Sequence, residues 1–255
     1  MKALKMDLKR AFCSWKFPVS VLLGAAVCGF TLLFCTHYIS STVHRYVYIH
    51  DRSQIFLAYI VGLLPYSTCI YDDFSYGNIR NNLGRVSPKV YVRAKVVAAL
   101  LSTMAAFILG KLLFVFIHSR FQPVGTADTA SGLAGSLLYY NLIVNGKYWF
   151  FLVMSSFHKS LYCLVLCMLV LLFSIWIHNL SVMYSVPVAA YYVLTFYVNG
   201  HLKADYLNLA MILGGTYGVW GNDVADLVYA LAVTALLCYL LYRAILWSIR
   251  KKVSQ

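Results

Sequence analysis

Two pairs of aspartates are placed where acidic side chains could do chemistry. All eight acidic residues of the chain are aspartates. Asp223 and Asp226 are three residues apart, a spacing that could present two carboxylates to Mg²⁺ from one helix face. The next acid of such a metal-diphosphate motif would fall at Ala230, so a cap at the start of the last apolar segment is the better interpretation. An intramembrane enzyme that uses Asp223 and Asp226 is kept as an alternative.

Other residue types give no pattern for a cofactor or a nucleotide. The seven histidines have no recognisable zinc spacing, and the seven cysteines lie in apolar runs or in the basic N-terminal segment, which indicates packing. The pairs Gly110–Lys111 and Gly146–Lys147 lack the preceding glycine and the following Ser or Thr of a phosphate loop. We therefore expect no catalytic residue, no metal and no cofactor in this chain, and we expect that it is not an enzyme.

The composition places these groups in a membrane protein. Of the 255 residues, 62% are hydrophobic and only 11% are charged, against about 25% charged residues in soluble domains. A soluble domain could not bury that much apolar surface, and disorder is excluded for the same reason. The net charge of +13 is of the kind that membrane proteins collect in cytoplasmic loops, so nucleic acid is not an expected partner.

Six apolar runs are long enough to cross a bilayer, which takes about 20 residues. We therefore predict an all-α integral membrane protein that forms a single transmembrane domain over residues 1–255. Pro65 in the second run predicts a kink. The predicted spans cover residues 17–35, 55–71, 96–117, 161–177, 182–198 and 227–247.

Basic residues predict the orientation of these spans. Segment 1–16 has five Lys and Arg residues, segment 72–95 has five and segment 243–252 has four, whereas the other loops hold few. With six spans, these three segments fall on one side, so we expect a multi-pass protein of the plasma membrane with both termini in the cytoplasm. Residues 1–16 also read as a basic amphipathic helix lying on the inner leaflet, in contact with membrane lipid. Its apolar arc consists of Leu4, Leu8, Ala11, Phe12 and Trp15.

The connection between the second and third spans is too long for a simple linker. Asp72 and Asp73 suit the start of a helix, and Gly84 suits its end. Phe74, Ile79 and Leu83 supply a short apolar set between them. The pattern predicts a helix on the cytoplasmic side that docks on a partner protein.

This segment resembles the permease subunits of type-two ABC exporters. The residues that carry the resemblance are Asp73, Gly77, Ile79, Arg80, Leu83, Ser87, Tyr91 and Lys95, together with an N-terminal segment similar to the family's elbow helix, Leu4-x-x-Asp7-Leu8-Lys9-Arg10-x-Phe12. The resemblance implies a coupling helix that fits a separate ABC ATPase subunit, which would bind the ATP and Mg²⁺. It also implies a second permease chain, in a homodimer or a heterodimer. The implied ATPase-coupling residues are Asp72, Asp73, Phe74, Gly77, Ile79, Arg80 and Leu83.

Few residues are candidates for the walls of a transport path. Lys111 is the only charge well inside a predicted span, and such a residue is a functional candidate unless its ammonium reaches the interface. Tyr191, Tyr192 and Tyr197 could line the path or form an aromatic belt. Lys159 and His158 are expected at the membrane interface. In the resembled family, the glycine-rich segment 214–222 would be a short re-entrant element before span six.

We therefore expect half of an export path for a hydrophobic or amphipathic cargo, best fitted by a peptide. An ATP-independent transporter is the other alternative. Such a transporter would be expected to carry paired ionisable residues or broken helices near the membrane midplane.

Overall fold

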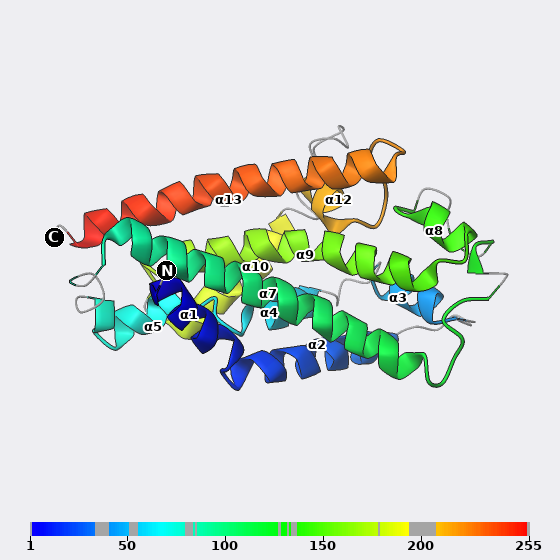
Figure 1. The fold of residues 1–255 in the computed structure, drawn as a ribbon, viewed down its shortest axis with the longest axis horizontal. Coiled ribbons are helices and arrows are strands. Elements are labelled where there is room, and N and C mark those ends of the chain that lie inside the picture. Colours follow the sequence, from blue (N-terminus) through cyan, green and yellow to red (C-terminus); the bar gives the residue numbers. More distant parts are fainter. Residues whose placement is uncertain are drawn as a thin grey trace.

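The protein is an elongated bundle of helices (Figure 1). The computed structural model describes residues 2–33, 41–50, 56–79, 84, 86–126, 129–131, 133, 137–177, 179–193 and 208–253. Within these residues there are eleven named helices and one isolated bridge, between Leu137 and Tyr217. The helices are α1 (Lys2–Phe12), α2 (Lys16–Leu32), α3 (Thr42–His50), α4 (Phe56–Leu63), α5 (Cys69–Ser75), α7 (Pro88–His118), α8 (Tyr140–Val144), α9 (Tyr148–Phe173), α10 (Leu180–Tyr192), α12 (Leu209–Gly214) and α13 (Asp223–Val253).

Three of these helices are long and apolar enough to cross a membrane. They are α7, α9 and α13, and a fourth candidate is the pair α1 and α2, which meet at an angle of 46°. The bend follows the expectation that the N-terminal basic helix turns before the first span. The all-helical fold predicted from the composition is therefore confirmed, and the several candidate spans support the predicted multi-pass character.

The prediction of six spans is only partly confirmed. The second predicted span, 55–71, is broken, because α4 ends at Leu63 and turns through Pro65 separate it from α5. The missing N–H of proline removes a helical hydrogen bond. The fourth predicted span began too late: α9 starts at Tyr148 rather than near Leu161. Of the fifth, 182–198, α10 accounts for the residues up to Tyr192, and 194–198 lie outside the described residues.

Local sequence signals set the ends of the long helices. Pro88 occupies the first turn of α7 after an extended Ser87, where a missing N–H costs nothing. The Asn179 side chain caps α10 by accepting from the N–H groups of Ser181 and Val182. Helix α13 carries aspartates in its first turn and Arg250, Lys251 and Lys252 in its last, as the helix dipole favours.

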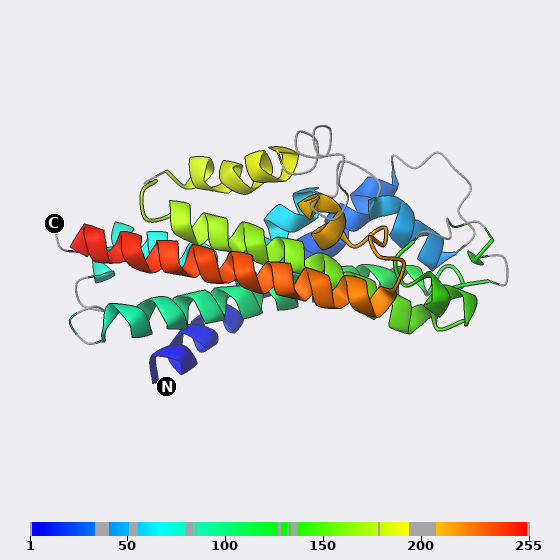
Figure 2. The ribbon, with the colours of Figure 1, turned by 90° about the horizontal axis from the view of Figure 1, so that it is seen from above.

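Helix α9 is the centre of the bundle. In its most apolar stretch 72% of the residues are buried inside the protein, against 17% for α13. Helices α7, α10, α12 and α13 all pack on α9, with α10 on one side of it and α7 on another (Figure 2). The exposed large side chains of α13, such as Leu236, Leu240 and Trp247, face away from the protein. These exposed apolar residues form a face suited to lipid.

The two ends of the bundle differ in content. Both termini and α5 lie at one end, while α3 and α8 lie at the other (Figure 1). The end with the termini therefore also gathers the basic segments 1–16 and 243–252.

Candidate functional site

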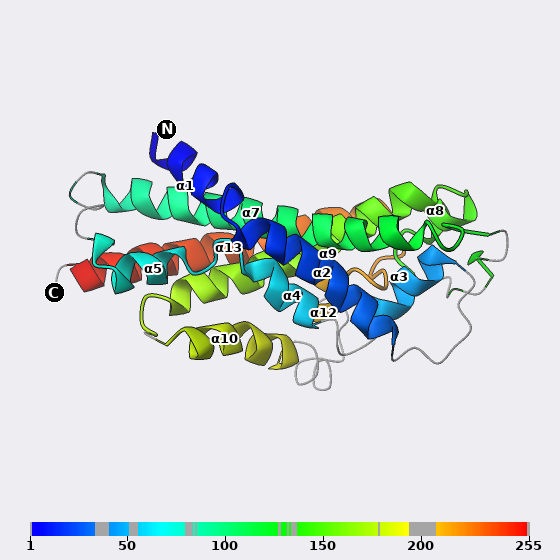
Figure 3. The ribbon, with the colours of Figure 1, turned by 90° about the horizontal axis from the view of Figure 1, so that it is seen from below.

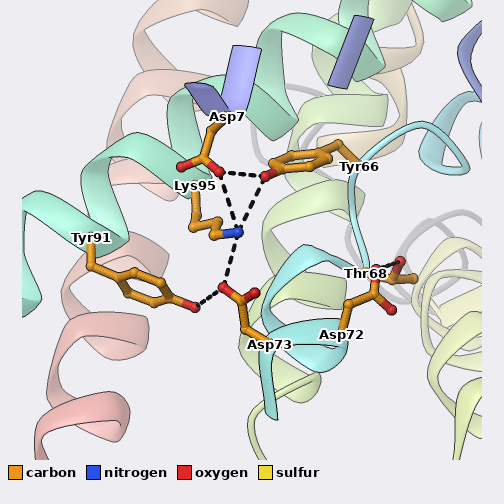
Figure 4. Close-up of polar contacts among 7 residues, drawn as sticks. All are labelled: Asp7, Tyr66, Thr68, Asp72, Asp73, Tyr91 and Lys95. Atoms are coloured by element: carbon orange, nitrogen blue, oxygen red, sulfur yellow. Dashed lines mark hydrogen bonds and ion pairs between the residues drawn. The ribbon is translucent and has the colours of Figure 1, made fainter. Parts of the chain in front are cut away.

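A buried lysine joins two aspartates near the end of the bundle where the termini lie. The ammonium of Lys95, on α7, is 3.0 Å from Asp73 Oδ2 of α5 and 3.3 Å from Asp7 Oδ1 of α1 (Figure 4). Lys95, Asp7 and Asp73 are 3%, 5% and 6% exposed. We call these three residues the Asp7–Lys95–Asp73 cluster. It connects three segments that are far apart in the sequence.

Two tyrosines complete the hydrogen bonding of the cluster (Figure 4). Tyr66 donates to Asp7 Oδ1 at 2.6 Å and accepts from Lys95 Nζ at 3.2 Å. Tyr91 donates to Asp73 Oδ2 at 2.7 Å. Each carboxylate therefore has an ammonium and a phenol as partners, which is the condition under which buried charges are tolerated.

Helical spacing explains how the sequence brings these groups together. Asp7 lies one turn from Ala11 on the face of α1 that packs against α7. Tyr91 and Lys95 are four residues apart on α7, so both point to the same side. Asp73 faces inward from α5 while its neighbour Asp72 does not. The cluster therefore links α1, α5 and α7 through buried ion pairs.

Asp7 and Tyr66 were not predicted from the sequence as members of a site. Asp7 is the only acid in a basic amphipathic helix, and it is placed three residues after Leu4 and four before Ala11, on the apolar arc. A lone acid on an apolar face was the signal that could have indicated a buried partner. Tyr66 gave no comparable signal.

The predicted coupling residues do not form one surface. Asp72 lies towards Lys16, with Oδ2 4.0 Å from Nζ. Asp73 points into the cluster and Ile79 is buried. Phe74 is half-buried beneath Lys252, whose ammonium is 4.5 Å from the ring centroid. The predicted coupling residues Arg80 and Leu83 lie outside the described residues.

The predicted helix over residues 72–84 is wrong at its start and is not continuous. Helix α5 begins at Cys69, so Asp72 and Asp73 lie within it rather than capping it. The helix ends at Ser75, and Gly77 has a φ of +67°. A left-handed residue stops an α-helix, which is why glycine occupies this position. The result is an exposed tip that consists of residues 75–78, in which Tyr76 is 78% exposed.

The C-terminal end of α13 also reaches this region. Lys252 Nζ donates to the carbonyl of Ile175 at 2.5 Å, just beyond the end of α9. The same ammonium lies over Phe74 of α5. A cation beside the last carbonyls of a helix is favoured by the helix dipole. Helix α5 is thus linked to α13 as well as to α1 and α7.

Lys111 lies inside the bundle rather than at its lipid surface. Its side chain is 2% exposed, and its ammonium is 4.1 Å from the centroid of the Phe107 ring. It is also 2.5 Å from Nε2 of His50. Because His50 Nδ1 is hydrogen-bonded to the carbonyl of Tyr46, Nδ1 carries the proton and Nε2 accepts from Lys111. The alternative in which Lys111 reaches the membrane interface through lipid is therefore wrong.

A second buried lysine lies near Lys111. Lys159 on α9 is 2% exposed and donates to Ser155 Oγ at 2.9 Å. The ammonium groups of Lys111 and Lys159 lie 5.9 and 5.2 Å from the ring of Tyr46. Lys159 and His158 were expected at the mouth of the fourth span, but α9 starts earlier, at Tyr148, and both residues lie within it and are buried.

The three tyrosines proposed for a path have different surroundings. Tyr191 is 9% exposed and packs against Tyr59 and Tyr162, each with a centroid distance of 5.8 Å. Tyr192 is 39% exposed and contacts Phe56 at 5.5 Å. Tyr197 lies outside the described residues. Tyr191 therefore belongs to the aromatic core, whereas Tyr192 is at the surface.

Asp223 and Asp226 hold backbone loops. Asp223 Oδ1 accepts from the N–H of Tyr139, and Asp226 Oδ1 accepts from the N–H groups of Val219 and Trp220. Burial raises the pKa of the Tyr139 phenol, and the two aspartates raise it further. Among the described residues there is no group of three or more His, Cys, Asp or Glu side chains that could hold a metal ion. These contacts give both aspartates a structural role at the start of α13.

Comparison with known proteins gives no relative. The chain matches no protein-family profile, and neither the curated proteins nor the solved structures include a significant match. Among the described residues the fold is all-helical, with three or four long apolar helices that could span a membrane.

Proposed function

We propose that the chain is the permease subunit of an ATP-driven exporter. In this proposal it resides in the plasma membrane with both termini in the cytoplasm, and it pairs with a second permease chain and with ABC ATPase subunits. Each pair of chains would enclose a path for a hydrophobic or amphipathic cargo, best fitted by a peptide. The ATP and Mg²⁺ would be bound by the ATPase.

The observation that carries the proposal is the Asp7–Lys95–Asp73 cluster. An ATPase that moves a membrane chain needs a rigid element on which to act and a connection from it to the spans. The cluster supplies such a connection, because it joins α5 to both α1 and the start of α7 through buried ion pairs. Lys252 adds a contact between α5 and the end of α13. A force applied at α5 would therefore reach three of the four candidate spans.

The exposed tip is the surface proposed to meet the ATPase. It follows α5 directly, it lies at the end of the bundle that holds both termini (Figure 1), and Tyr76 offers a large aromatic contact there. Aromatic residues are enriched among those that dominate binding energy in protein interfaces. The basic segments at the same end support a cytoplasmic position.

Site-specific photocrosslinking tests the contact. Tyr76 is replaced by p-benzoylphenylalanine in one variant, and Phe121 is replaced in the control. The two side chains are 78% and 80% exposed, but Phe121 lies after α7, at the opposite end. Irradiation of native membranes should crosslink the Tyr76 variant to a protein that binds ATP analogues, and should not crosslink the Phe121 variant to it. Equal crosslinking at both positions, or none to an ATP-binding protein, would refute the proposal.

A second candidate function is an ATP-independent transporter. The observation that favours it is the pair of buried lysines, Lys111 and Lys159, with His50 beside one of them. Ionisable residues inside the membrane mark substrate or ion paths in many transporters. Purified chain in proteoliposomes distinguishes the two functions. Uptake driven by an ion gradient in the absence of any ATPase would favour this candidate, and strict dependence on ATP and on a partner ATPase would eliminate it.

A further inference from the structure

A groove opens beside the bend between α1 and α2. It has a volume of about 600 Å³, within the range of small-molecule sites. The start of α2, the segment from Leu64 through α5, and the start of α10 form its walls. Figure 3 shows these helices from the side on which α2, α4 and α10 are seen. The three residues of the Asp7–Lys95–Asp73 cluster do not line this groove.

Opposite charges lie together at the polar part of the groove. Lys16 Nζ and Asp72 Oδ2 are 4.0 Å apart, and their side chains are 40% and 39% exposed. Thr68 adds a hydroxyl that donates to Asp72 at 3.4 Å. An exposed ion pair at this distance contributes little to stability, so a ligand could replace each partner at small cost. A ligand that offered an anion to Lys16 and a cation to Asp72 would complement both.

Aliphatic and aromatic side chains line the rest of the groove, among them Tyr71, Tyr76 and Tyr184. Val19 and Leu23 on α2 face Leu64 across it, and Trp15 stands at the rim with 71% of its surface exposed. An exposed tryptophan beside a lysine at the start of an apolar helix is typical of a membrane interface. The polar part of the groove thus matches a lipid headgroup, and the adjoining apolar part matches its acyl chain.

We propose that this groove binds a phospholipid with a zwitterionic, primary-amine headgroup, of the phosphatidylethanolamine type. The phosphate lies at Lys16, and the ammonium donates to Asp72 and Thr68. One acyl chain runs along Val19, Leu23 and Leu64. A primary ammonium fits better than choline, because it has three N–H donors for these oxygen acceptors and choline has none. The lipid comes from the leaflet on which α1 lies, and binding does not depend on the transport function proposed above.

Native mass spectrometry of the purified full chain tests the proposal. The delipidated protein is titrated with phosphatidylethanolamine, phosphatidylcholine and phosphatidylglycerol of identical acyl chains. Phosphatidylethanolamine should bind about tenfold more tightly than the other two, the low end of what a hydrogen bond to a charged group is worth. Asp72→Asn should remove this preference, and Lys16→Gln should weaken binding of all three lipids. Lys147→Gln, an exposed lysine near the opposite end, is the matched control and should change nothing.

A steric pair tests the apolar part. Leu23→Trp should fill the groove and reduce lipid binding at least about tenfold. Leu33→Trp places the same bulk beyond the other end of α2, at a residue that is 79% exposed, and should leave binding unchanged. If the three lipids bind equally and Leu23→Trp does not reduce their binding, the bound molecules are annular lipid only, and the proposal is overturned. Equal or tighter binding of phosphatidylcholine would overturn the headgroup assignment.

Discussion

Replacing Lys95 with methionine removes the one ammonium that lies between two buried carboxylates. Asp7 and Asp73 are 5% and 6% exposed, so neither can exchange its lost partner for water. Breaking a buried ion pair by removing one member costs about 3–5 kcal/mol. Tyr66 and Tyr91 still donate to the two carboxylates, which keeps the cost of Lys95→Met within that range rather than doubling it. We expect a loss of about 3–5 kcal/mol in the free energy of unfolding.

The matched control is a triple variant, Asp7→Asn, Asp73→Asn and Lys95→Met. It removes every charge of the cluster and keeps its volume, so no buried charge is left without a counter-charge, which is the cause of the large loss in Lys95→Met. Reversible unfolding in mixed micelles, followed by circular dichroism, measures both variants. Lys95→Met should be strongly destabilised and the triple variant should recover most of the loss. A Lys95→Met protein within about 1 kcal/mol of the wild type, or a triple variant no better than the single, would refute the buried ion pairs.

Three further variants give separate tests. Gly77→Ala should cost about 1–2 kcal/mol because φ is +67° there, whereas Gly84→Ala, with the same open space but no positive φ, should be neutral in thermal unfolding. Gly215→Ala should destabilise by more than about 2 kcal/mol in the same assay, because its Cβ would lie 2.5 Å from the His158 ring, and a change under about 0.5 kcal/mol would contradict this packing. Lys111→Leu should lower the stability by about 1–3 kcal/mol, because His50 Nε2 loses its donor, and should change the cargo-stimulated ATPase rate. An unchanged ATPase rate would exclude a role of Lys111 in the transport path.

Composition and apolar run length predicted what depends on hydrophobicity alone. Helix α13 and the body of α7 follow the predicted spans, because continuous apolar sequence has few alternatives in lipid. The start of α9 was missed because Ser155, Ser156, His158 and Lys159 interrupt the apolar pattern. These side chains are buried by tertiary contacts, which a window of sequence does not contain.

The candidate site was predicted in part for a similar reason. Asp73 and Lys95 were singled out by the resemblance, but their pairing with Asp7 depends on the angle between α1 and α7. The exposed tip was also predicted only in part. Gly77 was among the residues that carry the resemblance, but the helix was expected to continue through it. The spacing in the sequence gave no sign of the left-handed φ that ends α5.

The position of α9 at the centre of the bundle bears on how the chain is made. Its polar residues must enter the bilayer during synthesis, before α12 and α13 exist. Tyr46 bonds Ser156 and Tyr139 bonds His158, and both tyrosines precede α9 in the chain. The carbonyl of Ile212, the second partner of His158, is translated later. When α9 has been synthesised, the hydroxyl partners of Ser156 and His158 therefore already exist, and these two polar groups need not wait for the later helices.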